Sequence, residues 1–191
     1  MSILSAFKTL SLVATGVAFV ALVAVEKVQA ALITSVSDPA LSNANVIDFE
    51  SVTPGIYTSI TLGDVTFSTP SDRVEFISVA YSGNYNTQGQ SLQNTYDLRG
   101  FDTLTISFSS PTNAFGFNWG ASDAPWTLTA FDSAGTALDS QVLPITSASN
   151  SGDFFGINAG SSLISYATLA TNNFNDYVFI DNFSSAKLAC N

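Results

Sequence analysis

Three carboxylates near the two ends of the chain have the residue types and spacing to hold a cation. Asp48 and Glu50 alternate with apolar residues in VIDFES, and Asp181 stands among apolar and aromatic residues in DYVFIDNFSS. A buried carboxylate without a partner is costly, so Asp181 requires a charge partner, a metal ion or an edge position. Calcium takes about six to eight oxygen ligands, including backbone carbonyls, so two or three acids suffice. In the alternative interpretation, Asp48 and Glu50 face solvent and Asp181 caps a turn.

The elements that position these acids read as strands almost throughout. Short runs with an apolar and polar alternation of period two are separated by Gly, Asn, Asp, Ser or Pro, and no sustained helical period with caps follows residue 30. The pattern predicts an all-β, antiparallel two-sheet jelly-roll sandwich. The expected strands cover residues 45–50, 56–61, 64–69, 74–81, 103–109, 113–120, 126–132, 137–143, 153–158, 163–170 and 176–185. Chain ends tend to meet at the surface, which would bring Asp48 and Glu50 to Asp181.

Two features refine this organisation. The runs TLTISFS (103–109) and NAFGFNWG (113–120) flank the turn signal SPT, which predicts a hairpin. The amide-rich segment SGNYNTQGQSLQNTYDLRG (82–100) predicts a long surface loop, a common place for binding residues. Exposed aromatic rings flanked by amides are the groups that stack on sugars. The candidate ligand-binding residues are therefore Tyr81, Tyr85, Tyr96, Asn84, Asn86 and Trp126, the last at a rim, with core packing as the alternative for each ring.

Several catalytic classes are excluded by composition. The chain contains no histidine, which rules out a Ser-His-Asp or Cys-His arrangement and removes the commonest zinc ligand. It also has no phosphate-binding loop, dinucleotide fingerprint or EF-hand loop. A carboxylate pair for glycoside hydrolysis stays open, because Asp and Glu are present. We therefore expect a protein that is not an enzyme.

Residues 1–30 have the layout of a signal peptide. Lys8 precedes an uncharged apolar stretch from Thr9 to Val25, and small residues end the segment at Ala30. We expect cleavage there, leaving a single domain over residues 31–191 that is secreted and has no membrane attachment; the alternative is an uncleaved anchor. The single cysteine, Cys190, excludes an intramolecular disulfide and leaves open an interchain disulfide or a free thiol.

The charge balance points to the class of partner. The chain carries a net charge of −10, and removal of residues 1–30 takes away one acid and two lysines, which leaves about −11. Such a surface repels phosphate backbones, so we expect no nucleic acid partner. It suits cations, or solubility outside the cell.

The acids also resemble a known pattern. The segment FES followed by Gly55, with the closing FIDNF, resembles the ends of jelly-roll carbohydrate-binding modules of the galactose-binding-like kind. In those modules an early FE glutamate and a late IDD aspartate typically hold a structural calcium. The resemblance implies calcium ligands at Glu50 and Asp181, with Asp48 nearby. Asn182 replaces the second aspartate and can offer its carbonyl oxygen.

A broader resemblance covers residues 45–184. The order of AFGFNWG, TAFDSAGTAL, FFGI and FIDNF is similar to exported bacterial proteins that often end in a PEP-CTERM sorting tail, many of them surface or extracellular-matrix proteins. The segment SSAKLACN lacks Pro-Glu-Pro, an apolar helix and a basic cluster. Together these observations favour a secreted, calcium-stabilised module that binds extracellular polysaccharide. The alternative is a structural surface or matrix protein without a defined small ligand.

Overall fold

A computed structural model describes residues 30–69, 74–77, 81–94, 103–147, 153–173 and 176–188, with the backbone alone for residues 74–77 and 94. Its strands form two antiparallel sheets. The larger sheet contains β1 (Ala31–Ile33), β2 (Asn45–Ile47), β3 (Gly55–Tyr57), β6 (Val74–Ile77), β7 (Ser91–Asn94), β9 (Ala114–Gly120), β12 (Phe154–Asn158) and β14 (Phe179–Ser185). The smaller sheet contains β4 (Ser59–Leu62), β5 (Val65–Ser68), β8 (Thr103–Thr112), β10 (Trp126–Phe131), β11 (Ala137–Leu143) and β13 (Ile164–Ala170).

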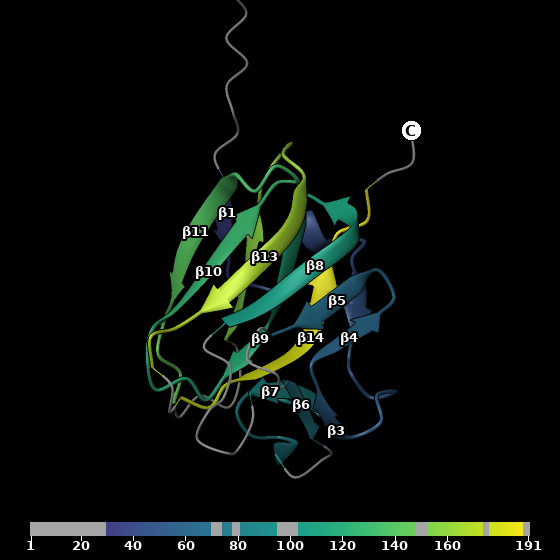
Figure 1. Cartoon of the computed structure of the whole chain (residues 1–191). Coiled ribbons are helices and arrows are strands. Elements are labelled where there is room, and N and C mark those ends of the chain that lie inside the picture. Colours follow the sequence, from purple (N-terminus) through teal and green to yellow (C-terminus); the bar gives the residue numbers. More distant parts are fainter. Residues whose placement is uncertain are drawn as a thin grey trace, which may run out of the picture.

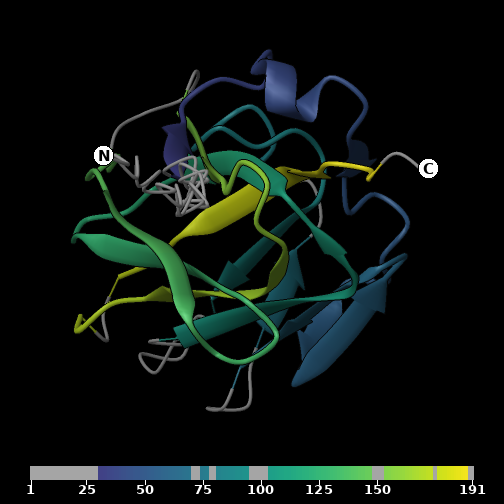
Figure 2. The same ribbon diagram turned by 90° about the horizontal axis from the view of Figure 1, so that it is seen from above.

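The order of strands confirms the predicted two-sheet sandwich. Figure 1 looks onto the smaller sheet, in which β11, β10, β13, β8, β5 and β4 follow one another from left to right. The larger sheet lies behind it in the order β1, β12, β9, β14, β7, β6 and β3, with β2 paired to β14. From β7 to β10 and again from β11 to β14, each strand crosses to the opposite sheet, as in a jelly roll. The short 3-10 helix η1 (Pro39–Leu41) lies outside the larger sheet, as the view from above shows (Figure 2).

Aromatic side chains fill the space between the sheets. In residues 103–108 of β8 and 126–130 of β10 alternate residues are buried, and the intervening Thr and Ser side chains face outward. Phe183 of β14 meets Phe67 of β5 edge to face at 5.2 Å, and Trp119 of β9 meets Trp126 of β10 at 5.7 Å. Such contacts add about 0.5–1.5 kcal/mol to the burial of each pair. The side chain of Trp119 is fully buried in this core.

Close approach of two strands requires glycine at the centre of the larger sheet. Gly156 of β12 pairs with Gly116 of β9. A Cβ atom at Gly156 would lie 2.0 Å from the carbonyl oxygen of Phe115, which is backbone and cannot move aside. The two glycines therefore let β12 and β9 lie together beneath the ring of Phe154, which would clash with a Cβ at Gly116.

Three predicted elements differ from the structure. The hairpin prediction is wrong: β8 pairs with β13 and β5, whereas β9 belongs to the other sheet, so the SPT segment leads from one sheet to the other. The predicted strand at 56–61 divides into β3 and β4, which also belong to different sheets. The predicted loop at 82–100 contains β7, which pairs with β14 and β6. This pairing places the side chain of Leu92 in the core.

Some predictions concern residues that the structure does not describe. Residues 1–29 of the predicted signal peptide, Tyr96 and Cys190 lie outside the described residues. Among the helices of the described segments, none has the length and apolar character needed to span a bilayer.

Candidate functional site

Two of the predicted cation ligands, Glu50 and Asp181, contact one short loop. The backbone N–H of Gln90 donates to Oε1 of Glu50 at 2.9 Å, and the N–H of Gln88 donates to Oδ2 of Asp181 at 2.8 Å. The acids from the two ends of the domain therefore contact positions two residues apart. We call residues 81–90 the clasp loop, because it joins Glu50 to Asp181.

A left-handed turn places Glu50 against the clasp loop. Strand β2 ends at Ile47, and Phe49 has a φ of 61°, a conformation that costs free energy for a residue with a Cβ. Burial of the Phe49 ring, which packs edge to face on Phe67 at 5.6 Å, offsets that cost. The turn leaves Asp48 and Glu50 exposed at the surface, so they do not alternate along one strand as the sequence predicts.

Asp181 is 1% exposed and lies in the middle of β14. The pKa of its carboxyl group is raised to about 6, chiefly by burial and to a smaller extent by the charges of Glu50 and Asp48. Hydrogen bonds from the N–H groups of Gln88 and Asn182 oppose that rise, and no positive charge contributes. The charges of Glu50 and Asp48 therefore both oppose the ionisation of Asp181.

The amide of Gln90 occupies a place that suits a cation. Its Nε2 donates to the carbonyl oxygens of Phe49, Glu50 and Val52 at 3.3, 3.0 and 3.0 Å. The residue is 7% exposed, and among the described residues its buried Oε1 has no hydrogen-bond partner. A buried acceptor without a donor is costly. This buried acceptor, in the residue whose backbone N–H donates to Glu50, is the feature that fits a bound cation or water.

The other predicted ligands lie around this point. Asn182 has a φ of 45° at a bulge in β14, and its N–H donates to Oδ1 of Asp181. Asp48 lines a surface pocket of about 410 Å³ together with Asp64. Within the described segments no group of three or more acidic or cysteine side chains is arranged to hold a metal by itself. A cation here would need backbone or amide oxygens as well.

The predicted ligand-binding residues of the clasp loop form an aromatic cluster. The ring of Tyr85 stacks on buried Phe179 at 5.4 Å with an interplanar angle of 3°. Tyr81 contacts both rings and is 38% exposed. Asn84 is exposed on a turn, and its carbonyl accepts from Thr87. Tyr81 and Asn84 are thus accessible to a ligand, whereas one face of Tyr85 is covered.

Asn86 and Trp126 have structural roles. The amide of Asn86 donates to the carbonyl oxygens of Asp153 and Trp119, which fixes the clasp loop on the end of β9. Trp126, predicted at a rim, is fully buried. The rim position is wrong because Trp126 starts β10 facing the core, where its Nε1 donates to Asp176. It cannot offer a ring face to a sugar.

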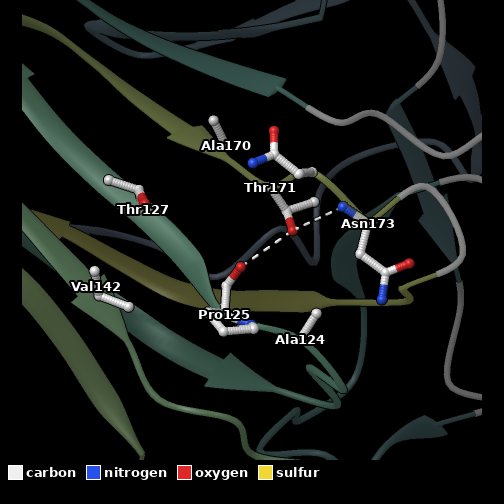
Figure 3. Close-up of a pocket in the computed structure, with 8 residues that line it drawn as sticks. Ala124, Pro125, Thr127, Val142, Ala170, Thr171 and Asn173 are labelled. Atoms are coloured by element: carbon white, nitrogen blue, oxygen red, sulfur yellow. Dashed lines mark hydrogen bonds between the residues drawn. The ribbon is translucent and has the colours of Figure 1, made fainter.

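A pocket of about 470 Å³ lies at the end of the smaller sheet. It opens between the ends of β10, β11 and β13, and Figure 3 shows Thr127 and Val142 on neighbouring strands opposite Asn173. None of its lining residues is charged: they are Ala124, Pro125, Thr127, Val142, Ala170, Thr171, Asn172 and Asn173. We call it the amide pocket, after its two exposed asparagines.

Asp176 holds the wall of the amide pocket in place. Its carboxylate accepts from the backbone N–H of Asp123 and Ala124 at 2.6 and 3.1 Å, and from Nε1 of Trp126 at 2.7 Å. Thr171 completes the wall by donating to the carbonyl of Pro125 at 3.1 Å (Figure 3). Sequence reasoning missed both the pocket and Asp176. An acid just before an apolar strand is the only signal in the sequence, and it does not reveal the donors 50 residues away.

Comparisons with known proteins assign no family. No protein-family model matches the chain. No curated protein matches it either. The K2 cleaved adhesin domain of Lys-gingipain is 8% identical with a TM-score of 0.49, and covers 75% of this chain and 99% of its own. A DUF4465 family protein from Bacteroides caccae is 10% identical with a TM-score of 0.42, covering 76% of this chain and all of its own.

A third solved structure is chitosan-binding module 1 of a chitosanase/glucanase from Paenibacillus sp. IK-5. It is 14% identical with a TM-score of 0.31, over 69% of this chain and 96% of that module. TM-scores below 0.5 at such identities assign neither a ligand nor an activity to this chain. The resemblances to galactose-binding-like modules and PEP-CTERM proteins stay predictions.

Proposed function

We propose that this chain is a secreted, non-catalytic module that binds an extracellular polysaccharide in the amide pocket. The observation that carries the proposal is the uncharged lining of that pocket, which combines Asn172, Asn173 and Thr127 with the apolar surfaces of Val142 and Pro125. Amides and hydroxyls match the hydroxyl groups of a sugar, and apolar surface matches its C–H faces. The volume lies in the range of about 300–1,000 Å³ that small-ligand pockets have.

The exposed ring of Tyr81 supports a second surface for the same function. Tyr81 and Asn84 are the accessible members of the clasp loop, and an exposed aromatic beside an amide also suits a sugar. The amide pocket is the better site because it is concave, whereas the Tyr81 ring packs on Tyr85 and Phe179.

Affinity electrophoresis tests the proposal and separates the two surfaces. The gels contain hydroxyethylcellulose, laminarin, galactomannan or alginate, and retardation of the protein measures binding. We expect at least one polymer to retard the wild type, and Asn172→Ala to weaken that binding about tenfold, the equivalent of one lost hydrogen bond of about 1.4 kcal/mol. The matched control is Asn43→Ala, at an exposed asparagine outside the pocket, which retains wild-type retardation.

Two results would contradict this proposal. Retardation that depends on Tyr81→Ala but not on Asn172→Ala would move the site to the clasp loop. Free migration in every polymer would favour a structural surface or matrix protein instead.

We also propose a structural calcium ion at the clasp. The supporting features are the negative charges of Asp48 and Glu50 that act on Asp181 and the orphaned Oε1 of Gln90. Glu50 and Asp181 would hold the ion. Asp48 and the side-chain carbonyl oxygen of Asn182 are the remaining candidate ligands. A bound calcium would supply the positive charge that these carboxylates lack and fasten β14 to the turn after β2.

Calcium is expected to stabilise the folded protein at pH 7.5. A ligand at 100 times its Kd adds about 2.7 kcal/mol, which for a domain of this size raises the Tm by roughly 5–10 °C. Thermal unfolding with 5 mM calcium, 5 mM magnesium or a chelator measures the effect. The rise in Tm with calcium should disappear in Glu50→Gln. It should persist in Asp123→Asn, which replaces an exposed acid next to the amide pocket. Equal Tm values with calcium and chelator would refute the calcium site.

A further inference from the structure

One row of hydroxyl side chains crosses the entire outer face of the smaller sheet. From β11 to β4 the paired residues are Ser140, Thr129, Thr168, Thr105, Ser68 and Ser59, so that every strand contributes a Ser or Thr. Neighbouring strands lie about 4.8 Å apart, so this row extends over about 24 Å. We call these six residues the hydroxyl row; Figure 1 shows the face that carries it.

The rows on either side are also uncharged. One contains Val142, Thr127, Ala170 and Thr103, and the other contains Ala137, Phe131, Tyr166, Ser107, Thr66 and Thr61. Asp139 pairs with Ala130, a core residue, and therefore points to the opposite side of the sheet. Across these three rows of the described chain, the register places no acidic or basic side chain, although the protein carries a net charge of −10.

The middle of the hydroxyl row is available to a ligand. The Thr129 and Ser140 hydroxyls bond to each other at 2.9 Å. Thr105 and Thr168 are half-buried, and in the described part of the chain their hydroxyls have no partner. The row that contains Val142, Thr127 and Ala170 adjoins the hydroxyl row, and these three residues also line the amide pocket. The pocket and the hydroxyl row are therefore one continuous surface.

We infer that this surface binds a single extended chain of a neutral polysaccharide, which enters the amide pocket and continues across the hydroxyl row. The inference rests on the proposed function and names its ligand class. Hydroxyl side chains donate to and accept from sugar hydroxyls, but they offer an anionic glycan no ion pair. The acidic remainder of the protein would repel such a glycan.

The twist of the sheet favours binding of a single polysaccharide chain over binding to the flat surface of a crystalline polysaccharide. Adjacent strands rotate by about 20° relative to one another, so six strands cannot present one plane. A single polymer chain can follow the twist. The stacked rings of Phe131 and Tyr166, 4.7 Å apart, lie in the next row and add apolar surface beside the hydroxyls.

The test places a charge in the middle of the hydroxyl row, outside the pocket lining. Thr105→Glu is compared with the wild type by affinity electrophoresis in hydroxyethylcellulose, laminarin, galactomannan and alginate. Oligosaccharides of increasing length, cut from the polymer that retards the wild type most, are titrated in parallel. The matched control is Ser37→Glu, which adds the same charge at an exposed turn. Thr168→Lys is a second variant, with Tm values to show that each protein is folded.

The expected result is binding of neutral polymers but not of alginate. Affinity should rise with oligosaccharide length until the ligand spans about 24 Å. Thr105→Glu and Thr168→Lys should each weaken polymer binding at least tenfold, and Thr105→Glu should leave the shortest bound oligosaccharide unaffected. Wild-type polymer affinity in both folded variants, or equal binding of alginate, would overturn the inference and leave the amide pocket as the site. Binding of no polymer by the wild type would overturn the proposed function itself.

Discussion

Replacement of Asp176 by alanine is expected to lower the free energy of unfolding by about 3 kcal/mol or more. The substitution leaves two backbone N–H groups and the Nε1 of Trp126 without their acceptor. Each buried donor left unsatisfied costs about 1–3 kcal/mol. Asp176 is 2% exposed, and its hydrogen bonds to Ala124 and Trp126 are buried, so these two donors are shielded from water. Urea unfolding at pH 7 measures the loss, and near-ultraviolet circular dichroism reports on the environment of Trp126.

Two variants make the Asp176 prediction specific. Asp176→Asn keeps one acceptor oxygen and should fall between the alanine variant and the wild type. Asp123→Ala removes a neighbouring exposed carboxylate and should change stability by less than about 0.5 kcal/mol. If Asp176→Ala were as stable as Asp123→Ala, the three hydrogen bonds would not hold the pocket wall. Because that wall includes Ala124 and Pro125, Asp176→Ala should also weaken polysaccharide binding.

The second large effect is a loss of stability as Asp181 ionises. Burial raises the pKa of Asp181 from 3.8 to about 6, so the folded protein binds this proton more tightly than the unfolded chain. Its contribution to stability is fully present below pH 3.8 and is lost as the pH rises through about 6. At 1.36 kcal/mol per pKa unit, the loss is about 3 kcal/mol. Urea unfolding in chelator between pH 4 and 7.5 measures it.

Asp181→Asn separates the ionisation of Asp181 from the ionisation of the other acids in the protein. The variant cannot ionise, so the difference in stability between wild type and variant should shrink by about 2.5 kcal/mol from pH 4 to pH 7.5. At pH 4 the variant should be the less stable protein, because its amide nitrogen faces one of the two N–H donors. Asp123→Asn should keep the wild-type pH dependence. Parallel curves for wild type and Asp181→Asn would contradict the raised pKa of Asp181.

The sandwich could be predicted because its signals are local. Alternation in 103–109 and 126–132 marks strands with one buried face, and the same alternation distinguishes the Leu104 face from the Thr105 face. The pairing of strands could not be predicted. The SPT segment looks like a hairpin turn, yet it carries the chain from one sheet to the other. Strands β8 and β9 pack face to face across the core and do not pair edge to edge in one sheet.

Part of each candidate site could likewise be predicted from the sequence, and part could not. Glu50 and Asp181 could be identified because acids among apolar residues need partners. Their partners, the N–H groups of Gln90 and Gln88, could not be identified, because backbone donors carry no sequence signal. The amide pocket was beyond prediction for a related reason. Its asparagines look like ordinary loop residues, and the hydroxyl row exists only once the register of six strands is known.

Amide chemical-shift mapping tests the central claim most directly. The isotope-labelled protein is titrated with the oligosaccharide derived from the polymer that binds it in gels. If the amide pocket is the site, the largest shifts fall on residues 124–127 and 170–173. Shifts confined to residues 81–90, or no shifts at millimolar oligosaccharide, would contradict polysaccharide binding in the amide pocket.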